Sequence, residues 1–216
     1  MSALNAGQGL CVARARLLIR PARAAIELGA GGDALAAALR AVHHANRHGS
    51  TADFIAIAFP QMRMGRETML PGNDLELVGS EVSLAVFLAL EGVKTLQRRG
   101  MIEPHEIADS FAEVGQVGAA YVRDRACEKR TVGWLRRTAA RAERRAKPLG
   151  KPVKPRADDT KTLVLQHGET ILHIREILGN YGAEPLMVST YGLSCVGQPA
   201  ILPIYPDALK DAHDAA

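Results

Sequence analysis

A run of basic side chains in the second half of the sequence has the chemistry that binds phosphate groups. It covers residues 123–156 and comprises Arg123, Arg125, Lys129, Arg130, Arg136, Arg137, Arg141, Arg144, Arg145, Lys147, Lys151, Lys154 and Arg156. Only three acidic residues interrupt it, so without this run the chain would be net acidic, although its formal charge is +4. A guanidinium group offers a planar fork of N–H donors that matches phosphate oxygens. Positive charge gathered in one segment therefore indicates a surface for a polyanion.

The same run predicts an arginine-rich helix over residues 129–147, because alanine and arginine both favour helix formation. Near one side of it, at spacings of about three and four residues, fall Arg130, Arg137, Arg141 and either Arg144 or Arg145, and Arg136 is a further candidate for RNA binding. Like charges at this spacing repel, so a bound anion would stabilise the helix. A membrane-binding helix needs bulky apolar residues on its other face, and here that face is mostly alanine. Nucleic acid is thus favoured over a membrane, with a solvated basic face as the alternative; charge alone does not separate RNA from DNA.

Three histidines near the end of an earlier predicted helix are candidates for other chemistry. His44 and His48 have the i, i+4 spacing of a metal-binding pair, but no third ligand accompanies them, so we predict no metal site. His43 lies on the flank of the apolar face of that helix. The negative end of the helix dipole would stabilise its imidazolium and raise its pKa. The plain alternative is that His43 and His44 are surface side chains without a chemical role.

Strand and helix patterns alternate along the first half of the chain. They predict a strand in VARARLLI that stops before Pro21, a helix from Asp33 as N-cap to Gly49, a strand in DFIAIAFP, a loop in MRMGRETMLPGND, a strand in LELV, a helix from Ser80 to Gly100 and a strand in VGQVGAAYVRDRA. This β-α-β-β-α-β order is that of ferredoxin-like and RNA-recognition domains. We therefore expect an α+β protein with a ferredoxin-like domain over residues 1–122. Residues 123–216 would form a smaller region, with the arginine-rich helix followed by strands in KTLVLQ, TILHIRE, PLMVSTYG and AILPIYP.

The composition is that of a globular protein, with 47% hydrophobic and 23% charged residues among 216. Three widely spaced cysteines fit neither a zinc site nor a disulfide framework, so a reducing cytoplasm is the expected compartment. No apolar run is long enough to span a membrane. The Arg- and Ala-rich N-terminus vaguely resembles a transit peptide, but a first strand explains its alternation better.

The ending STYGLSCVGQPAILPIYP, with its Tyr-Gly-Leu-Ser, resembles that of the CRISPR repeat-RNA endoribonucleases of subtype I-F. Further segments resemble the same family in the same order: ARLLIRP its opening strand, RAVHHAN the helix with its catalytic histidine, FIAIAFP its second strand, and YVRDRACEK with WLRRTAARAERRAKPLG its linker and arginine-rich helix. The resemblance covers nearly the whole chain. No single motif is specific, but the ordered set is.

The resemblance implies an endoribonuclease that needs no metal and no other cofactor. Family members place the arginine helix in the major groove of a CRISPR repeat hairpin and cut at the 3′ base of its stem. The 2′-OH of the nucleotide attacks the adjacent phosphate and leaves a 2′,3′-cyclic phosphate. Such a protein would keep its product and join the other subunits of a CRISPR effector complex. The alternatives are a subunit that holds an RNA hairpin without cutting it and, less favoured, a DNA-binding architectural protein.

Residues in the matching positions take their roles from the same resemblance. His43 would be the general base, with His44 as its rival because counting back from the Phe-Pro strand selects it. Tyr191 would orient the histidine or the attacking sugar. The family's serine has no counterpart in LVLQHGET, where His167 or Gln166 occupies the neighbourhood, and Thr190 and Ser194 are weaker substitutes.

In the linker before the arginine helix, the family reads the base of the stem with Arg and Gln side chains. Arg123 and Arg125 stand in that place, and an arginine can bind guanine through two hydrogen bonds. The glutamine has no clear match. The narrow major groove of A-form RNA leaves phosphate contacts along the rest of the stem.

Overall fold

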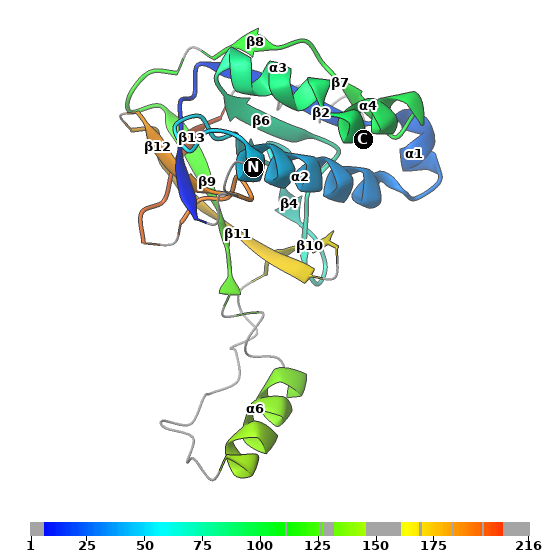
Figure 1. The fold of residues 1–216 in the computed structure, drawn as a ribbon, viewed down its shortest axis with the longest axis vertical. Coiled ribbons are helices and arrows are strands. Elements are labelled where there is room, and N and C mark those ends of the chain that lie inside the picture. Colours follow the sequence, from blue (N-terminus) through cyan, green and yellow to red (C-terminus); the bar gives the residue numbers. More distant parts are fainter. Residues whose placement is uncertain are drawn as a thin grey trace.

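The computed structural model describes residues 7–110, 112–125, 127, 132–145, 161–168, 170–182, 184–195 and 197–204. They form a mixed α+β structure with several sheets and helices (Figure 1). The helices are α1 (Arg23–Glu27), α2 (Gly31–His48), α3 (Glu81–Ala89), α4 (Glu91–Arg98) and α6 (Val132–Arg144). The two larger sheets together position the candidate site.

The first sheet has the strand order β3-β6-β2-β7, and each neighbouring pair is antiparallel. Its strands are β2 (Ala15–Pro21), β3 (Ala56–Ala58), β6 (Leu75–Gly79) and β7 (Ile102–Pro104), with β8 (Ala108–Asp109) pairing to β2 beside β7. Burial alternates along β2, whereas every residue of β6 is buried. These two strands are the central pair of the sheet, and helices cover them, which accounts for their high burial.

Helices α2 and α3 pack against β2 and against each other, and they close the core of this sheet. The apolar face of α2 carries Leu35, Leu39 and Val42, which are buried as their helical spacing predicts. Ser80 caps α3, because its hydroxyl oxygen accepts a hydrogen bond from the N–H of Ser83.

The second sheet has the order β13-β9-β11-β10-β5-β4. Its strands are β4 (Arg63–Met64), β5 (Met69–Leu70), β9 (Val117–Arg123), β10 (Leu163–His167), β11 (Thr170–Asn180) and β13 (Leu202–Pro203). A separate antiparallel pair joins β1 (Gln8–Cys11) to β12 (Leu186–Ser189). α2 also packs against β10, so it bridges the two sheets.

Four expectations from the sequence need correction. The strand expected at the end of the β-α-β-β-α-β series exists as β9, but it lies in the second sheet, and the short β7 pairs with β2 instead. The helix expected between Ser80 and Gly100 breaks at Leu90, whose ψ of 132° is not helical. The expected loop contains the hairpin of β4 and β5. Asp33 is not the N-cap of α2; that position is Ala30, and Asp33 lies in the first turn, where its charge still favours the helix dipole.

The described part of the arginine-rich helix is α6, which runs from Val132 to Arg144 and so ends before the expected Lys147. Figure 1 shows it beyond the ends of β9 and β10, apart from both sheets. Arg130 and the last ten residues lie outside the described residues. Within the described part of the chain, no helix has the length and apolarity that crossing a membrane requires.

Candidate active site

His43 is positioned by the last turns of α2. It follows Val42 of the buried stripe and is therefore half-buried at the edge of the core. One turn later, Asn46 is almost fully buried. Its amide group donates hydrogen bonds to the carbonyls of Ile55, at 2.9 Å, and Thr190, at 3.3 Å, and accepts one from the N–H of Ile55, at 2.8 Å. Asn46 thus ties the helix beside His43 to the segment that carries Tyr191.

Tyr191 lies in a tight turn that follows β12. At the next position Gly192 has φ +73°, its N–H donates to the carbonyl of Ser189, and its carbonyl accepts from the N–H of Ile57 in β3. A Cβ atom on this glycine would lie 2.8 Å from the carbonyl oxygen of Ile55, which is closer than such atoms approach. The Tyr-Gly of the Tyr-Gly-Leu-Ser motif therefore has a structural reason: only glycine lets the turn rest on the first sheet.

His167 is the last residue of β10. It pairs with Thr170 across the hairpin to β11, and Gly168 takes φ +60° in the turn. Because α2 packs against β10, the end of this strand lies beside His43. Three segments far apart in sequence thus meet at one place.

The rings of His43, His167 and Tyr191, called here the ring cluster, pack against one another. His43 stacks on Tyr191 with ring centroids 4.3 Å apart and an angle of 18° between the planes. His167 approaches both edge-on, at 5.2 Å from His43 and 5.0 Å from Tyr191. The guanidinium carbon of Arg123 lies 5.4 Å from the centroid of the Tyr191 ring, within the range of a cation–π contact. Two imidazoles and a phenol are therefore close enough to act on one small group.

Burial lowers the pKa of both histidines in the ring cluster, because it penalises the charged imidazolium. For His43 the charges of Arg47 and His44 add to this direction, and the nearby backbone of Thr190 opposes it. For His167 the added causes are the charges of His43, Arg40 and Arg123, and its own backbone opposes them. Both imidazoles are therefore favoured in the neutral form.

This direction corrects the expectation that the C-terminal end of α2 raises the pKa of His43. Desolvation is the largest cause, and it acts against protonation. A neutral imidazole is the form that accepts a proton, so the burial of His43 suits a general base better than the sequence suggests.

Each of the two histidines also has a ring nitrogen for which the described residues supply no partner. The Nδ1 atom of His43 and the Nε2 atom of His167 are buried, and no described group forms a hydrogen bond with either. The carbonyl of Thr190 lies near enough to His43 to affect its pKa, but it does not meet the geometry of a hydrogen bond to Nδ1. Leaving such a group unpaired costs about 1–3 kcal/mol, and unpaired groups of this kind call for an explanation such as a functional role.

His44 does not join the ring cluster. Its side chain is exposed and lies against His48, with ring centroids 4.2 Å apart. It lines a separate cavity between α2 and α4, together with Leu90 and Leu96. The structure thus separates the two neighbouring histidines that sequence reasoning left as rivals.

The residues considered in place of the family's serine also have different surroundings. Gln166 is exposed and bonds within its own hairpin turn. Thr190 is buried, and the Ser194 hydroxyl accepts a hydrogen bond from the N–H of Ala200. Of these four, His167 packs its ring against His43 and Tyr191.

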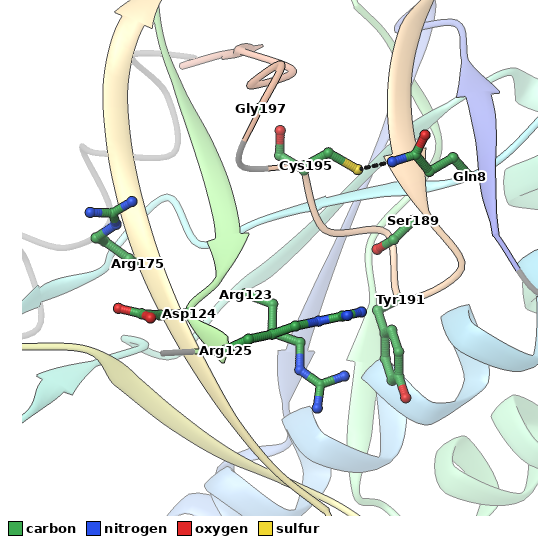
Figure 2. A pocket seen from close by; sticks show the side chains of 10 residues that line it. Gln8, Arg123, Asp124, Arg125, Arg175, Ser189, Tyr191, Cys195 and Gly197 are labelled. Atoms are coloured by element: carbon green, nitrogen blue, oxygen red, sulfur yellow. Dashed lines mark hydrogen bonds between the residues drawn. The ribbon is translucent and has the colours of Figure 1, made fainter. Parts of the chain in front are cut away.

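A cavity of about 660 Å³ has Tyr191 in its wall (Figure 2). Its lining, which defines the arginine pocket, consists of Gln8, Arg123, Asp124, Arg125, Arg175, Ser189, Tyr191, Ser194, Cys195 and Gly197. Three guanidinium groups against a single carboxylate make it a place for an anion. Neither histidine of the ring cluster lines the pocket, so Tyr191 and Arg123 connect the two.

The arginines expected to bind RNA fall into two groups. Arg123 and Arg125 line the arginine pocket, as described above. The exposed arginines of α6 are Arg136, Arg137, Arg141 and Arg144, and the exposed Arg145 directly follows the helix. The structure therefore does not gather all of these side chains into one site.

Sequence reasoning missed three residues of this region. Asn46 had a signal, because a polar residue stands where the apolar stripe of α2 continues one turn beyond Val42. Arg40 is exposed on α2, and its charge acts on His167. Arg175 of β11 had no signal, since an arginine in a strand most often points into solvent.

Within the described residues, no group of three or more His, Cys, Asp or Glu side chains is arranged to hold a metal ion. In comparisons with known proteins, no protein-family model and no curated protein sequence matches this chain.

Proposed function

We propose that this chain is a metal-independent endoribonuclease that binds the stem-loop of a CRISPR repeat and cleaves the precursor RNA at the 3′ base of the stem. The observation that carries the proposal is the ring cluster. His43 and Tyr191, which the family resemblance selected, and His167, which occupies the neighbourhood of the missing serine, lie within ring contact of one another. A pocket lined by arginines adjoins them. Together they supply proton transfer and phosphate binding, the two needs of 2′-OH attack on a phosphodiester.

In the proposed reaction His43 takes the proton of the 2′-OH that precedes the scissile phosphate. The 2′ oxygen bonds to phosphorus, the bond from phosphorus to the 5′ oxygen breaks, and a 2′,3′-cyclic phosphate remains. His167 donates a proton to the departing 5′ oxygen. The negative charge of the bound phosphate favours the imidazolium form of His167 and so opposes the effect of burial on its pKa. Tyr191 stacks on His43 and fixes the plane of its ring.

Positive charge for the phosphate comes from two arginines near the ring cluster. Arg123 lies over Tyr191, and Arg40 is close enough to lower the pKa of His167. Preorganised cations of this kind stabilise the charge that develops on the phosphate oxygens. Because His167 would stand in the place of the family's serine and can donate a proton, it would act as the acid as well as a positioning group.

The binding of the hairpin is proposed for α6 and the linker before it. The exposed arginines of α6 would contact phosphates of the stem, and Arg123 and Arg125 would contact its base. A ferredoxin-like N-terminal domain is part of the same proposal. Its support is the antiparallel order β7-β2-β6-β3, with α2 and α3 packed on β2. Retention of the cut hairpin would make the protein a subunit of a CRISPR effector complex.

The test is a cleavage assay in EDTA with the cognate repeat hairpin. A second RNA carries one 2′-deoxy nucleotide at the 3′ base of the stem. We expect cleavage of the all-RNA hairpin alone, with a cyclic phosphate on the 5′ product. Cleavage of both RNAs would overturn the 2′-OH mechanism, and loss of cleavage in EDTA would overturn metal independence.

A protein that binds both hairpins tightly and cuts neither would be a non-catalytic hairpin-binding subunit. The observation that favours this alternative is the absence of the family's serine, since LVLQHGET has none at that place. Preference for RNA over DNA of the same sequence separates both candidates from a DNA-binding protein.

A further inference from the structure

The partly buried side chain of Arg175 has no role in the reaction proposed above. Arg175 lies in β11, and its side chain lines the arginine pocket. Among the residues that the structure describes, its Nε atom has no hydrogen-bond partner, and the side chain as a whole is only partly buried. A guanidinium with an unpaired N–H in the wall of a pocket indicates a group that the pocket receives from outside.

The form and chemistry of the pocket limit what that group can be. A volume of about 660 Å³ lies within the range of cavities that bind one small molecule. Figure 2 shows Arg175 at one side and Tyr191 at the other, with Arg123 and Arg125 between them in this view. Ser189 and Gln8 add polar groups that can meet the edge of a base. Phosphate for the guanidiniums and a base for the polar groups together describe a nucleotide.

The place of the pocket decides which nucleotide of the substrate this is. It shares Tyr191 and Arg123 with the surroundings of the ring cluster, so its occupant is a neighbour of the scissile phosphate. Cleavage at the 3′ base of a stem leaves a paired nucleotide before the cut and an unpaired one after it. A nucleotide held in a pocket has to leave the helical stack, which costs least where it is already unpaired.

We propose that the arginine pocket binds the unpaired nucleotide that follows the scissile phosphate, with Arg175 as its phosphate-binding residue. This inference rests on the proposed function, and it adds a binding site on the leaving side of the cut. Holding that nucleotide also fixes the 5′ oxygen that departs, which aligns it with the attacking 2′ oxygen.

The experiment measures dissociation constants for two hairpins with a 2′-deoxy nucleotide at the cleavage position, so neither can be cut. One ends at the 3′ base of the stem, and the other carries one more nucleotide that ends in a 3′-phosphate, the group that Arg175 would bind. We expect the native protein to bind the extended hairpin about tenfold more tightly, since stacking and phosphate contacts of one nucleotide give an effect of this order. In R175Q this gain should be lost, while the affinity for the short hairpin stays the same.

An R99A variant, which removes an exposed arginine after α4, is the matched control and should keep the full gain. An R175K variant, which keeps the positive charge but not the planar fork of N–H donors, should keep only part of the gain in affinity. Thermal unfolding checks that each variant is folded. The inference is overturned if the native protein shows no gain, or if R175Q keeps it. If the native protein binds neither hairpin, the proposed function itself is wrong and the inference falls with it.

Discussion

At the scale of single residues, the structure distinguishes two neighbours that the sequence leaves equivalent. Successive residues on a helix differ by about 100° in direction, so His43 and His44 cannot both face the same site. His43 is half-buried against Tyr191, whereas His44 is exposed beside His48. Burial also lowers the pKa of His43, which favours the neutral form that accepts a proton.

Replacing either histidine of the ring cluster with alanine should slow cleavage without weakening binding. We expect H43A and H167A each to reduce the single-turnover rate by about 10²–10⁴-fold, the usual contribution of a positioned acid or base. H44A is the matched control, since it removes the adjacent imidazole from the same helix, and its rate should stay close to that of the native protein. If H44A were slow and H43A were active, His44 rather than His43 would be the general base.

The pH dependence of cleavage should report the lowered pKa of the base. A base acts in its neutral form, and a lowered pKa keeps His43 neutral to a lower pH than an ordinary histidine. We therefore expect kcat/KM, which reflects the free enzyme, to fall on the acid side with a midpoint below the ordinary value of 6.5. The measurement is a rate profile between about pH 5 and 8. A midpoint above the ordinary value would mean that the helix dipole outweighs burial.

At the scale of elements, the turn that carries Tyr191 depends on a backbone that only glycine accepts easily. In G192A the new Cβ meets the carbonyl of Ile55, and the positive φ adds strain of about 1–2 kcal/mol. We expect the free energy of unfolding in urea to fall by about 2 kcal/mol or more, and cleavage to fall with it because Tyr191 moves. G115A is the control, since Gly115 has φ +96° but open space around its Cβ. Equal losses in both variants would show that the contact with β3 contributes nothing.

Local patterns predicted most elements but not their partners. The stripe of α2 and the cap at Ser80 follow from spacing and hydrogen bonding within a few residues, so the sequence carries them. Strand β9 was expected, yet its place in the second sheet depends on pairing with β11, more than forty residues further on. β7 has three residues and ends in Pro104, which is too short for an alternating pattern. The break at Leu90 interrupts an otherwise helical sequence without a proline or glycine at that position.

The residues of the candidate site also differ in how far the sequence predicts them. His43 and Tyr191 stand in motifs that resemble a family, so their roles could be proposed from the sequence. His167 was proposed only from its neighbourhood, and its contact with His43 arises from the packing of α2 against β10. Arg175 enters the arginine pocket through the pairing of β11 with β9, which no local pattern of an isolated strand reveals.

At the scale of the whole molecule, the two functions of the proposed enzyme lie on different elements. The ring cluster is built where α2, β10 and the Tyr191 turn meet, whereas the exposed arginines of α6 stand beyond the ends of β9 and β10 (Figure 1). Each arginine that contacts a phosphate releases counterions from the RNA, so binding should weaken steeply as salt rises. The rate of cutting within the bound complex has no such dependence.

This separation predicts that α6 controls affinity and leaves the chemical step intact. In a variant with R137A and R141A together, we expect weaker binding of the hairpin and a salt dependence reduced by about one unit of slope for each lost phosphate contact. R99A, an exposed arginine removed from another helix, should leave the slope unchanged. At saturating protein, the double variant should still cut at the native rate, because its ring cluster is untouched. An unchanged slope would remove α6 from the RNA interface, and a slow saturated rate would mean that α6 also places the scissile phosphate against His43.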